Sequence, residues 1–372
     1  MRILVAEDLA SSDGGGAERS MGYLCEHLSS RHELFLIYQR TGDWVLDSLK
    51  SKWFVFIAKI STETFTQIGF LNWIKELFKL IHLCRVNRIE IIISHEVNSL
   101  FTLRVLSILT GIPVKYYFKW ISSKPNPGRL ASWGLKGLAK AAFVSSFIQR
   151  YWINVGLDEN RTQVIREGVE KVSFRNSPRS ELKKIVFAGR IIPDKGLHLV
   201  IKAIGSLKKD GFSDIRLAIC GYFSSTVEHS YVNYHREIEN LIYDVNLTEQ
   251  IDFKGFVKPL AKEIASSDLA VLPSICQEAS PLIILEALSV GTPIIASRVG
   301  GVPELLEGME YLIFQPEDPT ALAEKIKELT KTFKEDFNKR VLLSKQMIEV
   351  FDLTFSKDQS RYNLEIFFTH DE

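Results

Sequence analysis

The sequence has few cysteines and no long apolar run. Four of its 372 residues are cysteine, and their positions show no C-x-x-C spacing. This excludes a disulfide-stapled secreted fold and argues against zinc ligation. No stretch of 18 or more apolar residues occurs, so we expect no membrane-spanning helix. The apolar run after Met1 is too short for a signal peptide and acidic residues follow it at once, so the expected compartment is the cytoplasm.

Several sequence signatures of cofactor and metal chemistry are also missing. No D-x-D triplet occurs, so nothing offers the paired oxygen ligands that would hold Mg²⁺ or Mn²⁺ on a diphosphate. The absence of G-x-G-x-x-G argues against an NAD-dependent oxidoreductase, and the absence of G-x-x-x-x-G-K-[ST] argues against a P-loop enzyme. We therefore expect no metal site and no resident cofactor.

The chain has almost no net charge, because 46 Lys and Arg face 45 Asp and Glu. This balance argues against a nucleic-acid partner. The charge is unevenly spread, however. Residues 1–185 carry 26 basic and 17 acidic side chains, a net charge of +9, whereas residues 186–372 carry 20 and 28, a net charge of −8. The asymmetry fits peripheral contact of the first half with an anionic membrane, and equally fits two ordinary domains of opposite charge.

Short apolar runs alternate with amphipathic stretches along the whole chain. Many of these runs are almost continuously apolar, as is typical of strands buried on both faces. In the first half we expect strands at Ile3–Ala6, Leu34–Tyr38, Val55–Ile60, Glu90–Ser94, Val114–Phe118, Ala142–Ser145 and Gln163–Ile165. In the second half we expect them at Ile185–Ala188, Arg216–Cys220, Ile251–Phe253, Leu269–Leu272, Pro293–Ala296 and Tyr311–Phe314. The β-α-β rhythm predicts an α/β fold with two doubly wound parallel sheets.

A polar stretch at residues 171–184 indicates a linker between two domains, residues 1–170 and residues 185–355. Helices are expected between the strands, among them Leu197–Lys208 and an amphipathic helix over Phe65–Arg88. The latter helix is either an ordinary core helix, which we favour, or a segment that lies on a membrane.

Two further helices are expected at Ala17–Leu28 and Ala321–Thr330. Asp318 is the expected N-cap of the second, and Pro319 its first residue.

The strongest local signal is the segment that follows the strand ending at Leu272. We expect Ser280 to cap a helix whose first residue is Pro281 and which stops before Gly291. The amides of Leu282 and Ile283 would then point out of a helix N-terminus, which favours anions such as a diphosphate.

Two glutamates accompany this helix. Glu278 lies just before it, and Glu286 lies inside an otherwise almost wholly apolar run, where a charge needs partners. Such carboxylates suit hydrogen bonds to sugar hydroxyls. The alternative is one loop charge and one solvated helix residue.

A second signal follows the first strand of the second domain. Gly189 permits a tight exit turn, and Arg190 and Lys195 flank a short loop before the next helix. Two cations at the carboxyl end of a strand can hold a diphosphate. The alternative is a surface loop with two solvated charges.

A third signal is the run of three glycines at residues 14–16, between the first strand and the first helix. Glycines let the backbone approach a ligand closely, although a flexible turn explains the same residues.

These motifs resemble the retaining nucleotide-sugar glycosyltransferases of family 4, and the resemblance covers nearly the whole chain. It implies a GT-B fold, with two Rossmann-like domains facing a cleft and a C-terminal segment, residues 356–372, that crosses back to the first domain. The motifs that carry it are E-x7-E at Glu278 and Glu286, G-R-x4-K-G from Gly189 to Gly196, G-G-A-E from Gly15 to Glu18, and G-G-x-P-E from Gly300 to Glu304.

The resemblance implies roles for these residues. Arg190 and Lys195 would bind the donor diphosphate and neutralise the leaving group, Glu278 would contact the donor sugar, and Glu286 would bind the ribose. Glu278 need not attack the sugar, because the leaving phosphate is thought to act as the base. Further donor contacts are implied for Gly15, Gly16, Gly189, Val257, Ser280, Leu282 and Ile283.

The sequence departs from the family pattern at one notable place. A common family histidine is replaced by Lys119, which cannot act as a neutral imidazole. His95 ends a first-domain strand and either lines the acceptor cleft or is a satisfied strand-end histidine.

The expected function is metal-independent transfer of a sugar from a UDP- or GDP-sugar to a glycan, lipid-linked or small-molecule acceptor, in bacterial polysaccharide synthesis. The alternatives are another nucleotide-sugar enzyme on the same fold, such as a 2-epimerase, and a non-catalytic nucleotide-sugar binder.

Overall fold

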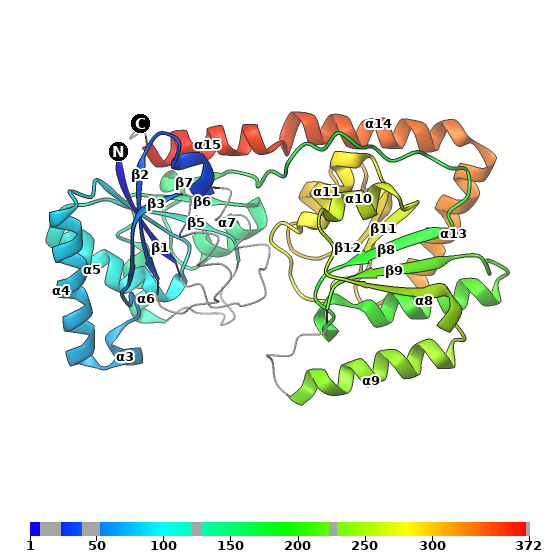
Figure 1. The fold of residues 1–372 in the computed structure, drawn as a ribbon, viewed down its shortest axis with the longest axis horizontal. Helices are drawn as coiled ribbons and strands as arrows, with labels where there is room; N and C mark the ends of the chain where they lie inside the picture. Colours follow the sequence, from blue (N-terminus) through cyan, green and yellow to red (C-terminus); the bar gives the residue numbers. More distant parts are fainter. Residues whose placement is uncertain (8–23, 39–52, 121–127, 223–228, 370–372) are drawn as a thin grey trace. The chain divides into compact units, whose positions relative to one another are not determined.

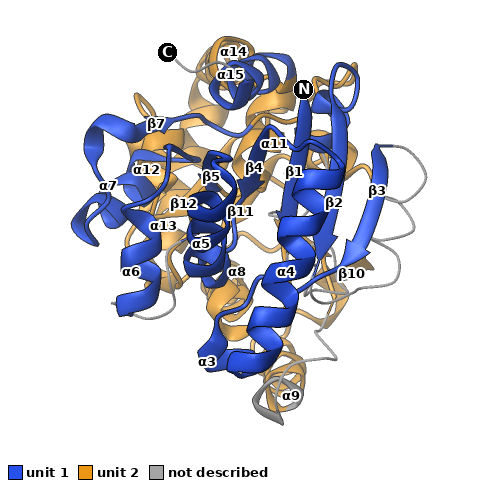
Figure 2. Ribbon diagram, turned by 90° about the vertical axis from the view of Figure 1, so that its left-hand side faces the viewer, with its two compact units in different colours: residues 1–167, 358–372 blue, residues 168–357 orange. Residues whose placement is uncertain are grey.

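The computed structural model describes residues 1–7, 24–38, 53–120, 128–222 and 229–369. The chain forms two compact units, drawn as a ribbon in Figure 1 and coloured separately in Figure 2. Unit 1 consists of Met1–Glu167 and Asp358–Glu372, and unit 2 consists of Gly168–Lys357. The end of the chain therefore packs with the first unit.

Unit 1 contains a seven-stranded sheet in the order β3-β2-β1-β4-β5-β6-β7, with every neighbouring pair parallel. The strands are β1 (Arg2–Glu7), β2 (Glu33–Tyr38), β3 (Phe54–Lys59), β4 (Ile91–Ser94), β5 (Val114–Phe118), β6 (Lys140–Phe143) and β7 (Thr162–Val164). Strands β4 and β5 are buried at every position, as their apolar runs predict.

The described helices of unit 1 are α3 (Phe65–Ile68), α4 (Phe70–Val86), α5 (Leu100–Thr110), α6 (Arg129–Leu135), α7 (Ser146–Asn154) and α15 (Lys357–Thr369). The prediction of one continuous helix over Phe65–Arg88 is wrong, because the structure has two helices there. Gly69 has a φ of +82° and separates α3 from α4. This backbone conformation is available to glycine at little cost and interrupts the helical hydrogen bonding.

Strand β6 ends two residues earlier than expected. Ser145 was assigned to the strand by its position in an apolar run, but its hydroxyl accepts a hydrogen bond from the Ile148 amide and caps α7. The predicted helix at Ala17–Leu28 lies largely outside the described residues.

The C-terminal helix α15 is fixed to unit 1 by buried polar contacts. The Lys115 ammonium is 1% exposed and donates to the carbonyls of Phe367 and Phe368, at 3.0 and 3.2 Å. The Glu365 carboxylate is contacted by His27 at 2.9 Å and by Arg31 at 3.1 Å. The two Lys115 bonds satisfy carbonyls that the end of a helix leaves without intrahelical donors, and all four contacts attach the helix to the unit.

Unit 2 contains a six-stranded parallel sheet in the order β10-β9-β8-β11-β12-β13. The strands are β8 (Lys184–Ala188), β9 (Arg216–Cys220), β10 (Ile251–Gly255), β11 (Leu269–Leu272), β12 (Ile294–Ser297) and β13 (Ile313–Phe314). The expected bounds of β5, β9 and β11 agree with the structure.

The helices of unit 2 are α8 (Leu197–Lys209), α9 (His229–Asp244), α10 (Leu260–Ala265), α11 (Leu282–Val290), α12 (Val302–Leu305), α13 (Pro319–Glu335) and α14 (Phe337–Thr354). Helices α10, α11 and α14 pack together on one side of the sheet, and α8 contacts α9 and α13 on the other (Figure 1). Asp318 caps α13 and Pro319 is its first residue, as predicted. The two doubly wound parallel sheets confirm the predicted fold class.

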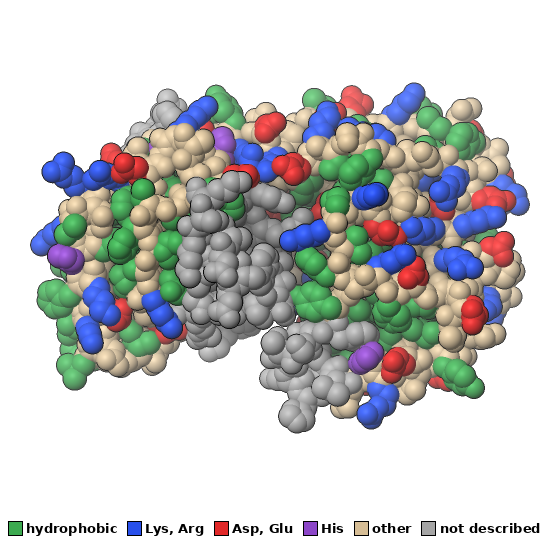
Figure 3. All heavy atoms as spheres, in the orientation of Figure 1, with side chains coloured by type: hydrophobic (Ala, Val, Ile, Leu, Met, Phe, Trp, Pro, Cys, Tyr) green, Lys and Arg blue, Asp and Glu red, His purple; other side chains and the backbone are tan. Residues whose placement is uncertain are grey.

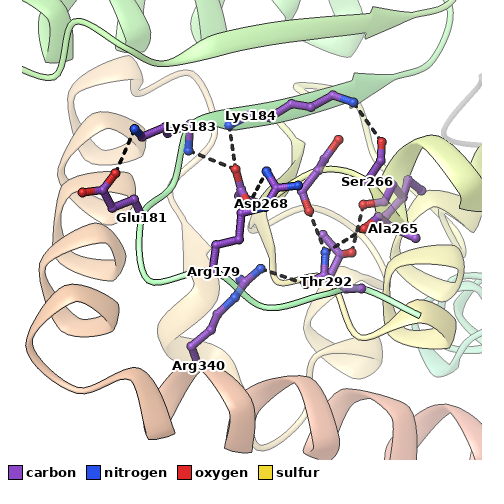
Figure 4. Close-up of polar contacts among 12 residues, drawn as sticks. Arg179, Glu181, Lys183, Lys184, Ala265, Ser266, Asp268, Thr292 and Arg340 are labelled. Atoms are coloured by element: carbon purple, nitrogen blue, oxygen red, sulfur yellow. Dashed lines mark hydrogen bonds and ion pairs between the residues drawn. The ribbon is translucent and has the colours of Figure 1, made fainter. Parts of the chain in front are cut away.

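The amino ends of β8 and β11 are joined by a buried polar network (Figure 4). The Asp268 carboxylate accepts hydrogen bonds from the amides of Lys183 and Lys184, at 3.0 and 2.9 Å. Asn176 donates to the carbonyls of residues 265 and 267 and accepts from the buried guanidinium of Arg340 at 3.1 Å. Residues 171–184, expected to be a linker, thus include segments held against unit 2.

Burial lowers the pKa of Arg340 to about 10, although the nearby carboxylate of Asp268 opposes this shift. The guanidinium therefore stays charged at neutral pH inside unit 2. Its ring contact with Phe333, 5.1 Å from the guanidinium carbon to the ring centre, adds a cation–π interaction.

Replacing Glu365 with Gln should destabilise the attachment of α15 in a pH-dependent way. Burial opposes ionisation of Glu365, but hydrogen bonds from His27 and Arg31 outweigh it and lower its pKa below 4.5. Its ionised form therefore stabilises the fold above about pH 4.5, and this contribution is lost as the pH falls through the folded-state pKa. We expect a loss of about 2 kcal/mol near pH 7 that shrinks in acid, measured by urea unfolding.

The control is Glu33→Gln, because Glu33 pairs with Arg2 on the exposed surface. It should cost less than about 1 kcal/mol. An equal loss for Glu365→Gln at acidic and neutral pH would show that the charge is not what attaches the helix.

Candidate active site at the carboxyl edge of the second sheet

The predicted donor-site residues of unit 2 lie in loops at the carboxyl ends of its parallel strands. Such ends share one edge of a sheet, and ligands of doubly wound sheets bind there. Arg190 and Lys195 follow β8, Val257 follows β10, and Glu278 follows β11. The topology β10-β9-β8-β11 places β8 and β11 side by side, so the loops carrying Lys195 and Glu278 are neighbours.

The loops after β8 and β11 touch along their main chains. Gly196 has a φ of +69°, and a Cβ atom at this position would lie 2.1 Å from the carbonyl oxygen of Pro273. The amide of Ile275 donates to the carbonyl of Asp194 at 2.8 Å. No side chain other than hydrogen fits at Gly196 without moving one of the loops.

This contact brings the two strongest sequence motifs together. The Lys195 ammonium lies 2.5 Å from Glu278 Oε1, and the Ser274 hydroxyl donates to the same oxygen at 2.5 Å. The side chains of Lys195 and Glu278 are 20% and 13% exposed. The ion pair is thus partly shielded from water, which strengthens it relative to a surface pair.

A third loop, which follows β12, holds the backbone of Glu278. The Gly301 amide donates to the Glu278 carbonyl at 2.8 Å. Gly300 has a φ of +51°, and a Cβ atom there would lie 2.0 Å from the same carbonyl. The Gln277 side chain accepts from the Gly300 amide at 2.7 Å. The predicted G-G-x-P-E segment therefore supports the E-x7-E segment through main-chain contact.

The start of α11 differs from the prediction. Pro281 is the N-cap in an extended conformation and Leu282 is the first helical residue, whereas we expected Ser280 as the cap and Pro281 as the first residue. The Ser280 hydroxyl is buried and makes no hydrogen bond within the described residues. The amides of Leu282 and Ile283 are the first two of the nine-residue helix, so the helix N-terminus lies one residue later than expected.

Glu286 lies one turn into α11 and is 6% exposed. Every residue of this helix from Ile283 to Val290 is buried, and the helix packs against α10 and α14. The left-handed Gly291 ends the helix, as predicted.

Arg190 is exposed and follows Gly189 at the end of β8. A Cβ atom on Gly221, at the end of β9, would lie 1.9 Å from the Gly189 carbonyl, so these two strand ends also meet through their main chains. Val257 is half-buried just after β10. The Arg190 guanidinium is therefore available to a ligand at this edge. Because Gly189 and Gly221 carry no Cβ, the main chains at the ends of β8 and β9 come into direct contact.

Sequence analysis did not identify Ser274, which is fully buried and donates to Glu278. Its position as the second residue after a buried strand is the signal that could have found it. Burial raises the pKa of the nearby thiol of Cys276, which keeps it protonated at neutral pH.

The two predicted cleft residues of unit 1 lie at neighbouring strand ends. His95 follows β4, is 2% exposed, and lies 3.0 Å from Glu96 and edge-on to the Trp120 ring. Lys119 follows β5, is 6% exposed, and lies 5.4 Å from the centre of the Tyr117 ring.

Gly15 and Gly16 lie outside the described residues. Among the residues that the structure does describe, no three His, Cys, Asp or Glu side chains are grouped so as to hold a metal ion. Within the same residues, no helix combines the length and apolarity needed to cross a bilayer.

Two family models match the chain. Residues 169–341 match "Glycosyl transferases group 1", and residues 14–171 match "Glycosyltransferase Family 4". Both halves of the chain are thus glycosyltransferase domains, and at this level the predicted enzyme class is confirmed.

Proteins of similar sequence are also named as glycosyltransferases. The chain is 29% identical over 182 residues to an uncharacterized glycosyltransferase of Methanocaldococcus jannaschii, a match covering 44% of each chain. It is 29% identical over 175 residues to the amylovoran biosynthesis glycosyltransferase AmsK of Erwinia amylovora, covering 43% of this chain and 40% of that one. These matches span less than half the length of either relative.

Solved structures share the fold over the full length. The HepE protein of Anabaena, crystallised with UDP, matches with a TM-score of 0.82 and 19% identity, covering 98% of both chains. Its complex with UDP-glucose matches with a TM-score of 0.76. A glycosyltransferase of Rickettsia africae matches with a TM-score of 0.81 and 19% identity, covering 98% of this chain and 97% of that one. The predicted GT-B fold is confirmed.

Replacing Gly196 with Ala should disrupt the junction of the first two loops. The added Cβ would overlap the Pro273 carbonyl, so we expect unfolding to become easier by about 3 kcal/mol, measured by denaturant titration. Gly211→Ala is the control, since Gly211 has a φ of +93° but no atom within 4 Å of an added Cβ. It should cost about 1 kcal/mol. Equal effects of the two substitutions would mean that only φ matters at Gly196.

Proposed function

We propose that this protein, whose two halves are glycosyltransferase domains, is a metal-independent retaining transferase. It moves a sugar from a UDP- or GDP-sugar to a hydroxyl of a glycan, lipid-linked or small-molecule acceptor. The observation that carries the proposal is the Lys195–Glu278 pair, 2.5 Å apart in neighbouring loops at the carboxyl edge of the second sheet. The UDP and UDP-glucose complexes of HepE, which has the same fold, support a nucleotide-sugar donor.

The diphosphate of the donor is bound by two cations and a helix end. Lys195 is held in place by Glu278, and Arg190 is exposed at the end of the adjoining strand. The amides of Leu282 and Ile283 add donors at the positive end of α11. Because Lys195 and the helix end are fixed before the donor arrives, they stabilise the charge that develops on the leaving diphosphate with little reorganisation.

The two glutamates bind the sugar and the ribose. Ser274 and Lys195 both contact Oε1 of Glu278, which in the described part of the chain leaves Oε2 for a hydroxyl of the donor sugar. Glu286 is buried one turn into α11 and binds the ribose hydroxyls. The carboxylates of Glu278 and Glu286 accept hydrogen bonds from these hydroxyl groups, which an apolar side chain cannot do.

Transfer exchanges one bond to the anomeric carbon for another on the same face of the sugar. The bond from this carbon to the β-phosphate oxygen breaks, and its electrons go to the diphosphate, where Arg190 and Lys195 neutralise them. The acceptor oxygen forms the new bond and passes its proton to the released phosphate. No side chain has to attack the sugar, so Glu278 positions the donor.

Unit 1 binds the acceptor. His95 and Lys119, at the ends of the neighbouring strands β4 and β5, contact it. The named role of AmsK in amylovoran biosynthesis supports a part in polysaccharide assembly. The site of action is the cytoplasm, with peripheral contact at an anionic membrane surface.

Replacing Lys195 with Ala should reduce kcat/KM by about 100-fold or more, because one preorganised cation is removed from the leaving diphosphate. Acceptor-dependent release of the nucleotide from the UDP- or GDP-sugar that stabilises the protein most measures it. Lys202→Ala removes an exposed lysine from α8, the helix that follows the Lys195 loop, and should leave the rate unchanged. A Lys195→Ala enzyme within about threefold of the wild type would contradict the role assigned to Lys195, whereas the absence of any transfer by the wild type would favour a non-catalytic binder.

A thermal-shift panel of UDP, GDP, ADP and their sugars identifies the donor, because a ligand of the native state raises the melting point. We expect UDP or GDP to stabilise the protein and NAD to have no effect. Release of free nucleotide only when an acceptor is present separates transfer from 2-epimerisation.

Chelation should leave the activity intact. The two cations and the helix end carry the electrostatic role that Mg²⁺ or Mn²⁺ would otherwise play. Transfer assayed with and without EDTA should proceed at the same rate. Complete loss of activity that Mn²⁺ restores would refute the metal-independent mechanism.

A further inference from the structure

Helix α4 of unit 1 is apolar on two opposite faces. Its inner face contains the buried residues Trp73, Leu77, Leu80, Leu83 and Cys84. On the outer face, Leu71 is 82% exposed, Phe78 is 67% exposed and Val86 is 62% exposed. At about 100° per residue these three side chains lie within about 80° of one another, so they form one outward stripe.

Cationic side chains lie within and beside this stripe. Lys75, Lys79 and Arg85 are all exposed on α4. At about 100° per residue, Lys75 and His82 lie between Leu71 and Val86, whereas Lys79 and Arg85 lie about 20° beyond the two edges of the stripe. The acidic residue between the two lysines, Glu76, forms an ion pair with Lys79 at 2.7 Å. The outer surface of α4 therefore combines exposed apolar and basic side chains, as do helices that lie in a membrane interface.

The neighbouring helices continue this character. Helix α5 packs beside α4, and α6 packs beside α5 (Figure 2). Ile108 and Leu109 at the end of α5 are 64% and 51% exposed. On α6, the partly exposed ring of Trp133 lies 3.9 Å from the guanidinium of Arg104. Residues 97–157 contain eight Lys and Arg and no Asp or Glu, and two of the eight, Lys115 and Lys119, are buried.

Figure 3 shows apolar and basic side chains mixed over the part of unit 1 that carries α4. The stripe from Leu71 to Val86 is about 22 Å long at 1.5 Å per residue. Two copies of this chain meeting through α4 would bring like charges together. An anionic lipid surface complements the basic side chains and accepts the exposed apolar ones at the same time.

We propose that α4 docks the protein on an anionic membrane surface. Leu71, Phe78 and Val86 enter the boundary between headgroups and acyl chains, and Lys75 and Arg85 contact anionic headgroups. The docking does not depend on the transfer chemistry, but it would present unit 1, where the proposed function places the acceptor, to acceptors in the membrane.

Sedimentation with vesicles tests the apolar stripe. The full-length protein should bind vesicles of phosphatidylglycerol and phosphatidylcholine, and bind much less to phosphatidylcholine alone or in high salt. Leu71→Ser/Phe78→Ser should weaken binding by about tenfold or more. Leu342→Ser/Leu353→Ser, which changes two exposed leucines of α14 in unit 2, should bind like the wild type.

The charge is tested separately. Lys75→Glu/Arg85→Glu should lower binding to anionic vesicles, whereas the control Lys331→Glu/Lys339→Glu on unit 2 should not. Circular dichroism and the UDP-induced melting shift should stay at wild-type values in all four variants. These readouts separate loss of docking from unfolding and from failure of the proposed nucleotide site.

Three results would overturn the proposal. The first is that the wild type fails to sediment with anionic vesicles. The second is that the α4 variants bind to these vesicles as tightly as the wild type does. In the third, gel filtration shows a wild-type dimer that Leu71→Ser/Phe78→Ser abolishes, which would make a second copy the occupant of the stripe.

Discussion

Close contact between main chains fixes the candidate site before any side chain contributes. The Pro273 carbonyl occupies the place where Gly196 would carry a Cβ, and the Glu278 carbonyl does the same at Gly300. Three loops from β8, β11 and β12 are thereby tied together at the carboxyl edge of one sheet. The 2.5 Å ion pair between Lys195 and Glu278 depends on this arrangement, because it joins two of these loops.

A site organised in this way is rigid in its backbone and adjustable in its side chains. Backbone contacts at glycine are geometric and do not vary with pH or salt, whereas ion pairs do. Lys195 and Glu278 orient each other across the loop junction, and Ser274, the second residue after β11, adds a further hydrogen bond to Glu278. Such positioning lowers the reorganisation that ligand binding and reaction require.

The fold was predictable because strands buried on both faces leave continuous apolar runs, as in β5, β9 and β11. The candidate site residues could be located from the sequence because they directly follow those strands. The exact start of α11 and the break between α3 and α4 could not be predicted in this way. Serine before proline suggested a cap at Ser280, yet Pro281 adopts the extended cap conformation itself. Gly69 interrupts a helix whose apolar periodicity continues across it, and periodicity alone does not report φ.

The two edges of the second sheet differ in what they offer a ligand. At the amino edge, two buried charges are held by the chain itself: Asp268 accepts from two main-chain amides, and Arg340 donates to Asn176. At the carboxyl edge, Arg190 is exposed and α11 presents its first amides. A buried charge that is removed from its partners costs free energy, whereas an exposed cation can exchange water for a phosphate. The same sheet is thus cross-linked at one edge and receptive to anions at the other.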